Sequence, residues 1–265
     1  MTALTVPVRA ARRVSPLTST LVFVGRSVRH SLRDVDALTM AIALPVILML
    51  LFTFVFGGAI DRSGDYVQYV VPGIILLCAG FGASSTAVDV ANDMSDGIVD
   101  RFRTMPLRSR GVVTGHVVAS LLRNLVATGV VIGVALLLGF RPTADVAQWI
   151  GALAIVALFI LAITWLFAAI GLAAKSPTAA SGYGFAVLFL PYLSSAFVPT
   201  DTMPDWLRWV AVNQPITPII ETIRALLFGR DPGSDLWWAL GWCALIVAAA
   251  YVWAAWLFRR SAGRR

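Results

Sequence analysis

Lysine, histidine and cysteine, which often act in catalysis or bind metals, are scarce in this sequence. Their spacing does not match that of known catalytic motifs. Lys175 is the only lysine, and it lies in the stretch AAIGLAAKS. A phosphate-binding loop of the pattern G-x-x-x-x-G-K-[ST] needs two glycines ahead of its lysine, but Ala169 and Ala174 hold those positions. The chain is therefore not expected to hydrolyse ATP by that route.

The sequence also lacks the motifs of metalloproteases and of serine-dependent enzymes. A metalloprotease needs two histidines four residues apart on a helix, whereas His30 and His116 lie far apart in the chain. The stretch GFGASST, residues 80–86, lacks the G-x-S-x-G pattern of a serine nucleophile and is more typical of a close helix-packing surface. Cys78 and Cys243 both fall in apolar runs and are interpreted as packing residues. The sequence thus disfavours an enzyme and predicts no metal or cofactor site.

The most chemically loaded segment is NDMSDGIVDRFRTMPLRSRG, residues 92–111, which lies between two apolar runs. Its aspartates come early and its arginines late, an order that complements a helix dipole, and Pro106 would end the helix. Ile98, Val99, Phe102 and Met105 would form one apolar strip. Such a helix could lie on anionic lipid or seat in a groove of a partner protein.

The composition around this segment is that of an integral membrane protein. Hydrophobic residues make up 58% of the 265, charged residues 13%, and the mean hydropathy is +0.82. The net charge of +7 comes almost wholly from arginines beside apolar runs, a pattern that sets membrane orientation and does not indicate nucleic-acid binding. A single all-α membrane domain with no large soluble domain is expected.

Six apolar segments are each long enough to cross the bilayer as a helix, which needs roughly 20 residues. We predict spans over Leu38–Ile60, Val67–Ala91, Val112–Phe140, Val146–Ala174, Pro177–Pro199 and Leu236–Phe258. The domain boundaries follow as a cytoplasmic N-terminus over 1–37, a six-span domain over 38–258 and a basic tail over 259–265.

Lysines and arginines are distributed unevenly between the two sides that six crossings define. Sixteen fall on the side of the two ends and the charged segment, and five fall on the other. By the positive-inside rule, both termini and the charged segment are expected in the cytoplasm.

Two flanking stretches are expected to be amphipathic. Before the first span, apolar residues from Leu17 to Val35 recur at three- and four-residue steps, which predicts a helix on the cytoplasmic membrane surface or one packed on the bundle. Residues 200–235 are too apolar for a solvated loop and predict two short helices that dip into the outer leaflet, with a surface hairpin as the alternative. The second of these helices is expected to carry an apolar stripe of Ile216, Ile219, Ile220, Ile223, Leu226 and Leu227. Glu221 and Arg224, three residues apart on its polar side, are expected to form an ion pair.

The stretch DGIVDRFRTMPLRSRGVVTGH, with the span that follows it, resembles the first cytoplasmic loop of ABC-2 type transporter permeases, particularly drug exporters of the actinobacterial daunorubicin-resistance kind. The stretch FVPTDTMPDWLRWVAVNQPITPIIETIRALLFG, residues 197–229, resembles the segment before the last span of the same family. With the basic amphipathic start and six spans, the similarity covers nearly the whole chain.

The resemblance implies a permease subunit of an ATP-driven exporter, a multi-pass protein of the bacterial plasma membrane. Two copies, expected to be identical, would form the pathway through the lipid for an amphipathic drug-like or lipid-like substrate. Two copies of a separate ATPase subunit would bind ATP and Mg and contact the permease through the surface helix and a coupling helix in the charged segment. Polysaccharide or other cargo, or a non-transporting membrane scaffold, are the alternatives left open.

Carried onto this sequence, the resemblance assigns residues to three roles. Coupling to the ATPase is expected of Asp96, Gly97, Asp100, Arg101, Phe102 and Arg103, with Arg26, Arg29 and Arg33 of the surface helix. The candidates for the substrate pathway are Phe52, Phe56, Phe81, Phe185 and Phe189, with plain packing between the spans as the alternative. The outer re-entrant hairpin is expected to include Trp206, Trp209, Glu221 and Arg224.

Overall fold

The computed structural model describes residues 35–60, 65–95 and 111–261, and within these ranges the regular structure is helical, with no strand. The predicted surface helix, with Arg26, Arg29 and Arg33, lies outside the described residues. So do the six predicted coupling residues of the charged segment, from Asp96 to Arg103.

The described helices follow one another along the chain in this order. The first half of the chain holds α2 (Val35–Leu50), the π-helical stretch η1 (Leu51–Phe56), α3 (Gly57–Ile60), α4 (Tyr66–Ser95) and α6 (Gly111–Leu137). The second half holds α7 (Val146–Ala173), α8 (Pro177–Val187), the 3₁₀ turns η2 (Leu190–Leu193) and η3 (Thr200–Thr202), α9 (Asp205–Asn213), α10 (Ile216–Leu227) and α11 (Ser234–Ser261).

Five of the six predicted spans are confirmed as helices long and apolar enough to cross a membrane. They run over Ala41–Ile60, Tyr66–Ser95, Val113–Leu137, Val146–Ala173 and Ser234–Leu257. The first is continuous through α2, η1 and α3, because the residues at their junctions, Leu50 and Gly57, keep right-handed helical dihedrals.

The segment predicted as the fifth span, 177–199, is not one membrane-length helix, and this part of the prediction was wrong. Ser176 caps α8 by accepting a hydrogen bond from the Ala179 amide, but α8 has only 11 residues. The η2 turn follows and ends in extended backbone at Ser194. Pro191 contributes to the break because it has no N–H to donate to a continuing helix.

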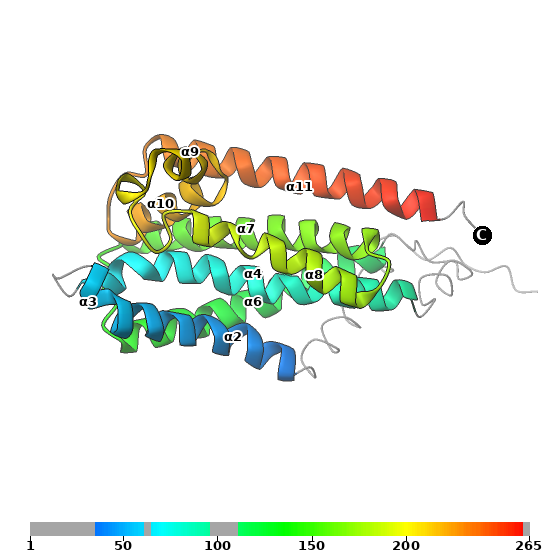
Figure 1. Ribbon diagram of the computed structural model, residues 1–265, viewed down its shortest axis with the longest axis horizontal. Helices are drawn as coiled ribbons and strands as arrows, with labels where there is room; N and C mark the ends of the chain where they lie inside the picture. The colour runs from blue at the N-terminus through cyan, green and yellow to red at the C-terminus, as the bar shows by residue number, and fades with distance from the viewer. Residues whose placement is uncertain (1–34, 61–64, 96–110, 262–265) are drawn as a thin grey trace, which may run out of the picture.

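The helices lie side by side as a bundle (Figure 1). The start of α2, the end of α4, the start of α8 and the end of α11 gather at one end of the bundle. The short helices α3, α9 and α10 gather at the other. The chain between the start of α8 and α9 therefore passes from one end of the bundle to the other, although α8 itself is short.

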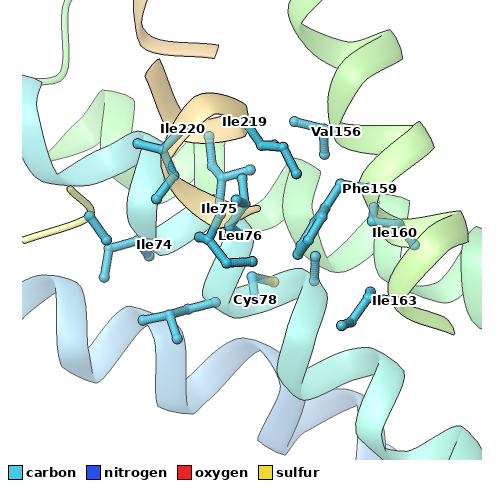
Figure 2. Packing of buried hydrophobic residues seen from close by; sticks show 14 of the residues in the cluster. Ile74, Ile75, Leu76, Cys78, Val156, Phe159, Ile160, Ile163, Ile219 and Ile220 are labelled. Carbon is cyan, nitrogen blue, oxygen red and sulfur yellow. The ribbon is translucent and has the colours of Figure 1, made fainter. Parts of the chain in front are cut away.

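Helix α4 is the centre of the packing and contacts α2, α6, α7, α8 and α10. The apolar stripe predicted on α10 is confirmed, because Ile219, Ile220 and Ile223 are fully buried. Figure 2 shows Ile219 and Ile220 directed into a cluster with Ile75 of α4 and Phe159 of α7. The hairpin formed by α9 and α10 is thus anchored in the bundle core through α10.

Candidate functional site

The broken segment after α8 leaves backbone carbonyls without helical partners inside an apolar bundle, where each unsatisfied polar group is costly. Four side chains from other elements donate to these carbonyls. Tyr66 and Tyr69 of α4 donate their hydroxyls to the carbonyls of Phe197 (2.7 Å) and Ser195 (2.8 Å). We call Tyr66, Tyr69, Gln214 and Arg224 the carbonyl clamp.

The other two members of the carbonyl clamp come from the α9–α10 hairpin. Gln214, at the turn between these helices, donates its amide to the carbonyls of Leu190 (3.2 Å) and Leu193 (2.7 Å) of η2. Arg224 donates to the Ser195 carbonyl at 2.9 Å. The carbonyl clamp therefore joins the broken segment to α4 and to the hairpin at once.

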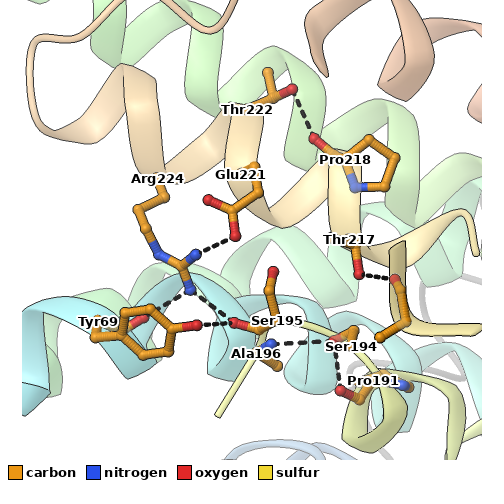
Figure 3. Close-up of polar contacts among 11 residues, drawn as sticks. Tyr69, Pro191, Ser194, Ser195, Ala196, Thr217, Pro218, Glu221, Thr222 and Arg224 are labelled. Carbon is orange, nitrogen blue, oxygen red and sulfur yellow. Dashed lines mark hydrogen bonds and ion pairs between the residues drawn. The ribbon is translucent and has the colours of Figure 1, made fainter. Parts of the chain in front are cut away.

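Arg224 is the most heavily used member of the carbonyl clamp (Figure 3). One guanidinium nitrogen, Nη2, donates to the carbonyls of both Tyr69 (3.1 Å) and Ser195, and the other, Nη1, pairs with the Glu221 carboxylate. The guanidinium also lies 4.0 Å from the centre of the Tyr69 ring. A planar group with several fixed donors suits this combination of stacking and hydrogen bonding.

The predicted ion pair between Glu221 and Arg224 is confirmed, but its placement on the polar side of the hairpin was wrong for the arginine. The Arg224 side chain is only 7% exposed, whereas that of Glu221 is 34% exposed. Sequence spacing indicates which residues are neighbours on a helix. It gives no information about backbone carbonyls of distant segments, and it is these carbonyls that hold the Arg224 guanidinium inside the bundle.

The two predicted hairpin tryptophans take no part in this network. Trp206 and Trp209 on α9 are 72% and 70% exposed. Exposed indole rings of this kind are typical of the boundary between lipid and water.

Gly73 allows the broken segment to lie directly on α4. A Cβ atom added at Gly73 would come within 2.6 Å of the Ala196 Cβ and 2.8 Å of the Ala196 carbonyl oxygen. Only a residue without a side chain fits this backbone approach. The two tyrosine hydroxyls reach their carbonyls because this contact is close.

Four of the five predicted pathway phenylalanines lie along one run of touching aromatic rings. Phe56 contacts Phe52, and Phe52 stacks on Phe197 with ring centres 4.2 Å apart. The run continues through Tyr192 to Phe189 and Phe185. Phe185 and Phe189 are more than half exposed, while Phe81 of α4 packs partly buried against the core and is not among these ring contacts.

Helices α4 and α6 are joined by polar contacts inside the bundle. Arg123 of α6 donates to the Gly82 carbonyl and to the Ser85 hydroxyl of α4. Asn124 is fully buried, donates to Ser120 and brings its amide oxygen to within 1.5 Å of where a Cβ on Gly82 would stand. The prediction that the GFGASST stretch is a close packing surface is confirmed at Gly82.

A further contact between α4 and α6 lies close in sequence to the two ends of the charged segment. Asp93, near the end of α4, lies 2.9 Å from the imidazole of His116, near the start of α6. This pair holds together the two helices between which the charged segment runs.

Residues 18–228 match the model of the ABC-2 type transporter family. The chain belongs to this family. The permease is 32% identical over 190 residues to a daunorubicin resistance ABC transporter permease protein of Streptomyces coeruleorubidus, covering 71% of this chain and 67% of the relative.

Other relatives of the permease extend the comparison. It is 25% identical over 246 residues to a probable doxorubicin resistance ABC transporter permease protein of Mycobacterium tuberculosis, covering 91% of this chain and 88% of the relative. A putative transport permease of Cyanophora paradoxa is 29% identical over 192 residues. Members of the family are membrane components of transporters, so the resemblance noted in the sequence is confirmed.

Sequence analysis missed three members of the carbonyl clamp: Tyr66, Tyr69 and Gln214. A signal was present for the tyrosines, because a phenolic hydroxyl within an apolar helix needs a hydrogen-bond partner. Their spacing of three residues puts both on one helix face. Their partners are backbone carbonyls of the segment 177–199, which was expected to be a continuous helix. Carbonyls within a continuous helix are already hydrogen-bonded, so no acceptors for the tyrosines were expected there.

Proposed function

We propose that this permease is the membrane subunit of an ATP-driven exporter that works with separate ATPase subunits. The observation that carries the proposal is the family match over residues 18–228. It is supported by relatives that are themselves named as permeases of drug-resistance ABC transporters. The lack of a phosphate-binding loop around Lys175 agrees with ATP and Mg being bound by the partner.

The permease crosses the membrane six times on this proposal, with both termini in the cytoplasm. Its fifth crossing is the interrupted segment 177–199, whose carbonyls are satisfied by the carbonyl clamp. The shared position of the start of α2 and the end of α11 at one end of the bundle supports an even number of crossings (Figure 1).

Coupling is assigned to residues of the charged segment, from Asp96 to Arg103, and to Arg26, Arg29 and Arg33. The Asp93–His116 contact supports this assignment, because it fixes the two helices on either side of the charged segment. A movement imposed on that segment by an ATPase would then pass into α4, the most widely connected helix of the bundle.

The cargo is proposed to be an amphipathic drug-like or lipid-like compound, carried between two identical permease copies. The partly exposed ring run that ends in Phe185 and Phe189 supports an apolar pathway. Phe52, Phe56 and Phe81 complete the proposed set.

The test is export by the permease co-purified with its ATPase in liposomes. A double variant, Phe102→Ala with Arg101→Glu, removes the apolar anchor and reverses a charge that sets register. We expect doxorubicin export to fall at least tenfold, while the permease still inserts and still binds the ATPase.

Arg108→Glu is the matched control, since it reverses a charge of the same segment outside the proposed coupling set. It is expected to export normally. Normal export by the double variant would show that coupling lies elsewhere. Loss of membrane insertion would instead mark a folding role for these residues.

A further inference from the structure

A cavity of about 500 Å³ lies between the α9–α10 hairpin and the start of α11. Its walls include Glu221 of α10 and Asp235, Trp238 and Trp242 of α11. Cavities of this size commonly hold small ligands. None of the assigned coupling or pathway residues lines it.

The net charge of the residues that line the cavity favours a cationic ligand. Glu221 is neutralised by its ion pair with Arg224, so Asp235 leaves the site with a net charge of about −1, and no lysine or arginine is among the lining residues. A monovalent cation would balance this charge. An anion would be repelled, and an uncharged ligand without hydrogen-bond donors would remove water from a carboxylate without replacing its hydrogen bonds.

The two tryptophans that line the cavity indicate which kind of cation it would bind. Trp238 and Trp242 lie four residues apart on α11, so they share one helix face and both reach the cavity. Indole faces attract organic ammonium groups, and Trp is the strongest of the aromatic side chains in this respect. The wall also holds hydroxyl and amide oxygens, but a hard metal ion would bind only such oxygen ligands and water, whereas an organic ammonium group can contact the indole faces as well as the carboxylates.

The position of the cavity points to an amphipathic ligand. Trp238 is 63% exposed at the start of the last span, where tryptophan marks the level of the lipid headgroups. An ammonium carried on an apolar chain would thus reach the cavity sideways from the bilayer interface, with its chain remaining in lipid.

We propose that this cavity, formed by Glu221, Asp235, Trp238 and Trp242, binds the ammonium group of an amphipathic molecule at the membrane interface. Binding requires no ATPase and no transport step. It is therefore tested separately from the proposed export function.

The experiment is calorimetric titration of the full-length permease in dodecyl maltoside with decyltrimethylammonium. Decyl sulfate serves as the probe of the same chain length and opposite charge, and empty micelles give the background. We expect saturable binding of the ammonium and none of the sulfate. Equal binding of both probes would overturn the proposal, because it would report only the apolar chain.

Two variants and two matched controls locate the site. Asp235→Asn and Trp238→Leu are each expected to weaken ammonium binding about tenfold. Asp205→Asn removes an acid of α9 that does not line the cavity, and Trp237→Leu removes the tryptophan next to Trp238 in sequence, which does not line it. Both variants are expected to bind the ammonium probe as the natural chain does. Unchanged binding of the ammonium probe by Asp235→Asn and Trp238→Leu would show that the probe does not bind in this cavity.

Competition identifies the source of the ammonium group. Displacement of the probe by phosphatidylethanolamine but not by choline would support a lipid headgroup, and displacement by choline would support a soluble amine. Displacement by neither would overturn the proposal.

Discussion

At the scale of single residues, Arg224 has the greatest energetic consequence. It is a buried cation that serves two carbonyls, a carboxylate and an aromatic ring. Removing one partner of a buried ion pair typically costs about 3 to 5 kcal/mol, because the other is left uncompensated. Glu221 is partly exposed, so water can reach it, and the cost here should be toward the lower end.

We expect Arg224→Leu to destabilise the permease by about 3 kcal/mol, measured as a lower midpoint of thermal unfolding in detergent. Arg224→Lys should fall between this variant and the natural chain, since a lysine keeps the charge but cannot form the same fork and stack. Arg208→Leu, at an exposed position of α9, is the control and should change little. An Arg224→Leu variant as stable as this control would refute the role of the carbonyl clamp.

A second prediction at this scale concerns Gly82 and Asn124. Gly82→Ala should destabilise the permease by about 1 to 3 kcal/mol, because the new methyl group would overlap the Asn124 amide. Asn124→Ala should relieve the overlap, so the double variant should be more stable than Gly82→Ala alone. The measurement is thermal unfolding of the four proteins of the cycle.

The control for that cycle is Gly129→Ala on α6, where an added Cβ meets nothing within 4 Å. It should be neutral or slightly stabilising, since alanine favours a helix over glycine. Additive effects of Gly82→Ala and Asn124→Ala would contradict the proposed contact.

At the scale of elements, the broken segment after α8 depends on groups supplied from elsewhere. Its carbonyls are paired with α4 and with the α9–α10 hairpin. An interrupted stretch of this kind is tolerated in a membrane protein only where such partners are available. The segment is also held less regularly than a helix, and it should open more easily than its neighbours.

The double variant Tyr66→Phe with Tyr69→Phe tests this dependence. Loss of two hydrogen bonds, worth about 1 kcal/mol each, should favour local opening and speed maleimide labelling of a cysteine placed at Val198 by roughly thirtyfold. Tyr183→Phe, at an exposed position of α8, is the control. The native Cys78 and Cys243 are fully buried and should add little background. An unchanged labelling rate would show that the hydroxyls do not hold the segment.

At the scale of the whole molecule, the proposed orientation can be tested from outside intact cells. A cysteine at Ser234, at the start of α11, should react with an impermeant maleimide, and a cysteine at Ser109 should not. The reason is that arginines concentrate on the side of Ser109, which the positive-inside rule assigns to the cytoplasm. Labelling at Ser109 alone would invert the topology.

The sequence by itself determined the class of the protein and most of its helices. Long apolar runs give membrane-length helices whatever their neighbours, because the bilayer leaves backbone groups no other partners. The stripe of isoleucines on α10 likewise fixed its buried face, and the spacing of Glu221 and Arg224 fixed their pairing. These patterns involve residues close together in the chain, so their periodicity can be recognised from the sequence alone.

Only the tertiary structure decided where the chain departs from a regular helix and what compensates for it. The break after α8 is stabilised by Tyr66, Tyr69, Gln214 and Arg224, which lie far from it in sequence. The ammonium-binding cavity, likewise, exists only because α10 packs beside the start of α11. These features rest on contacts between distant segments, and such contacts leave no periodic signal in the sequence.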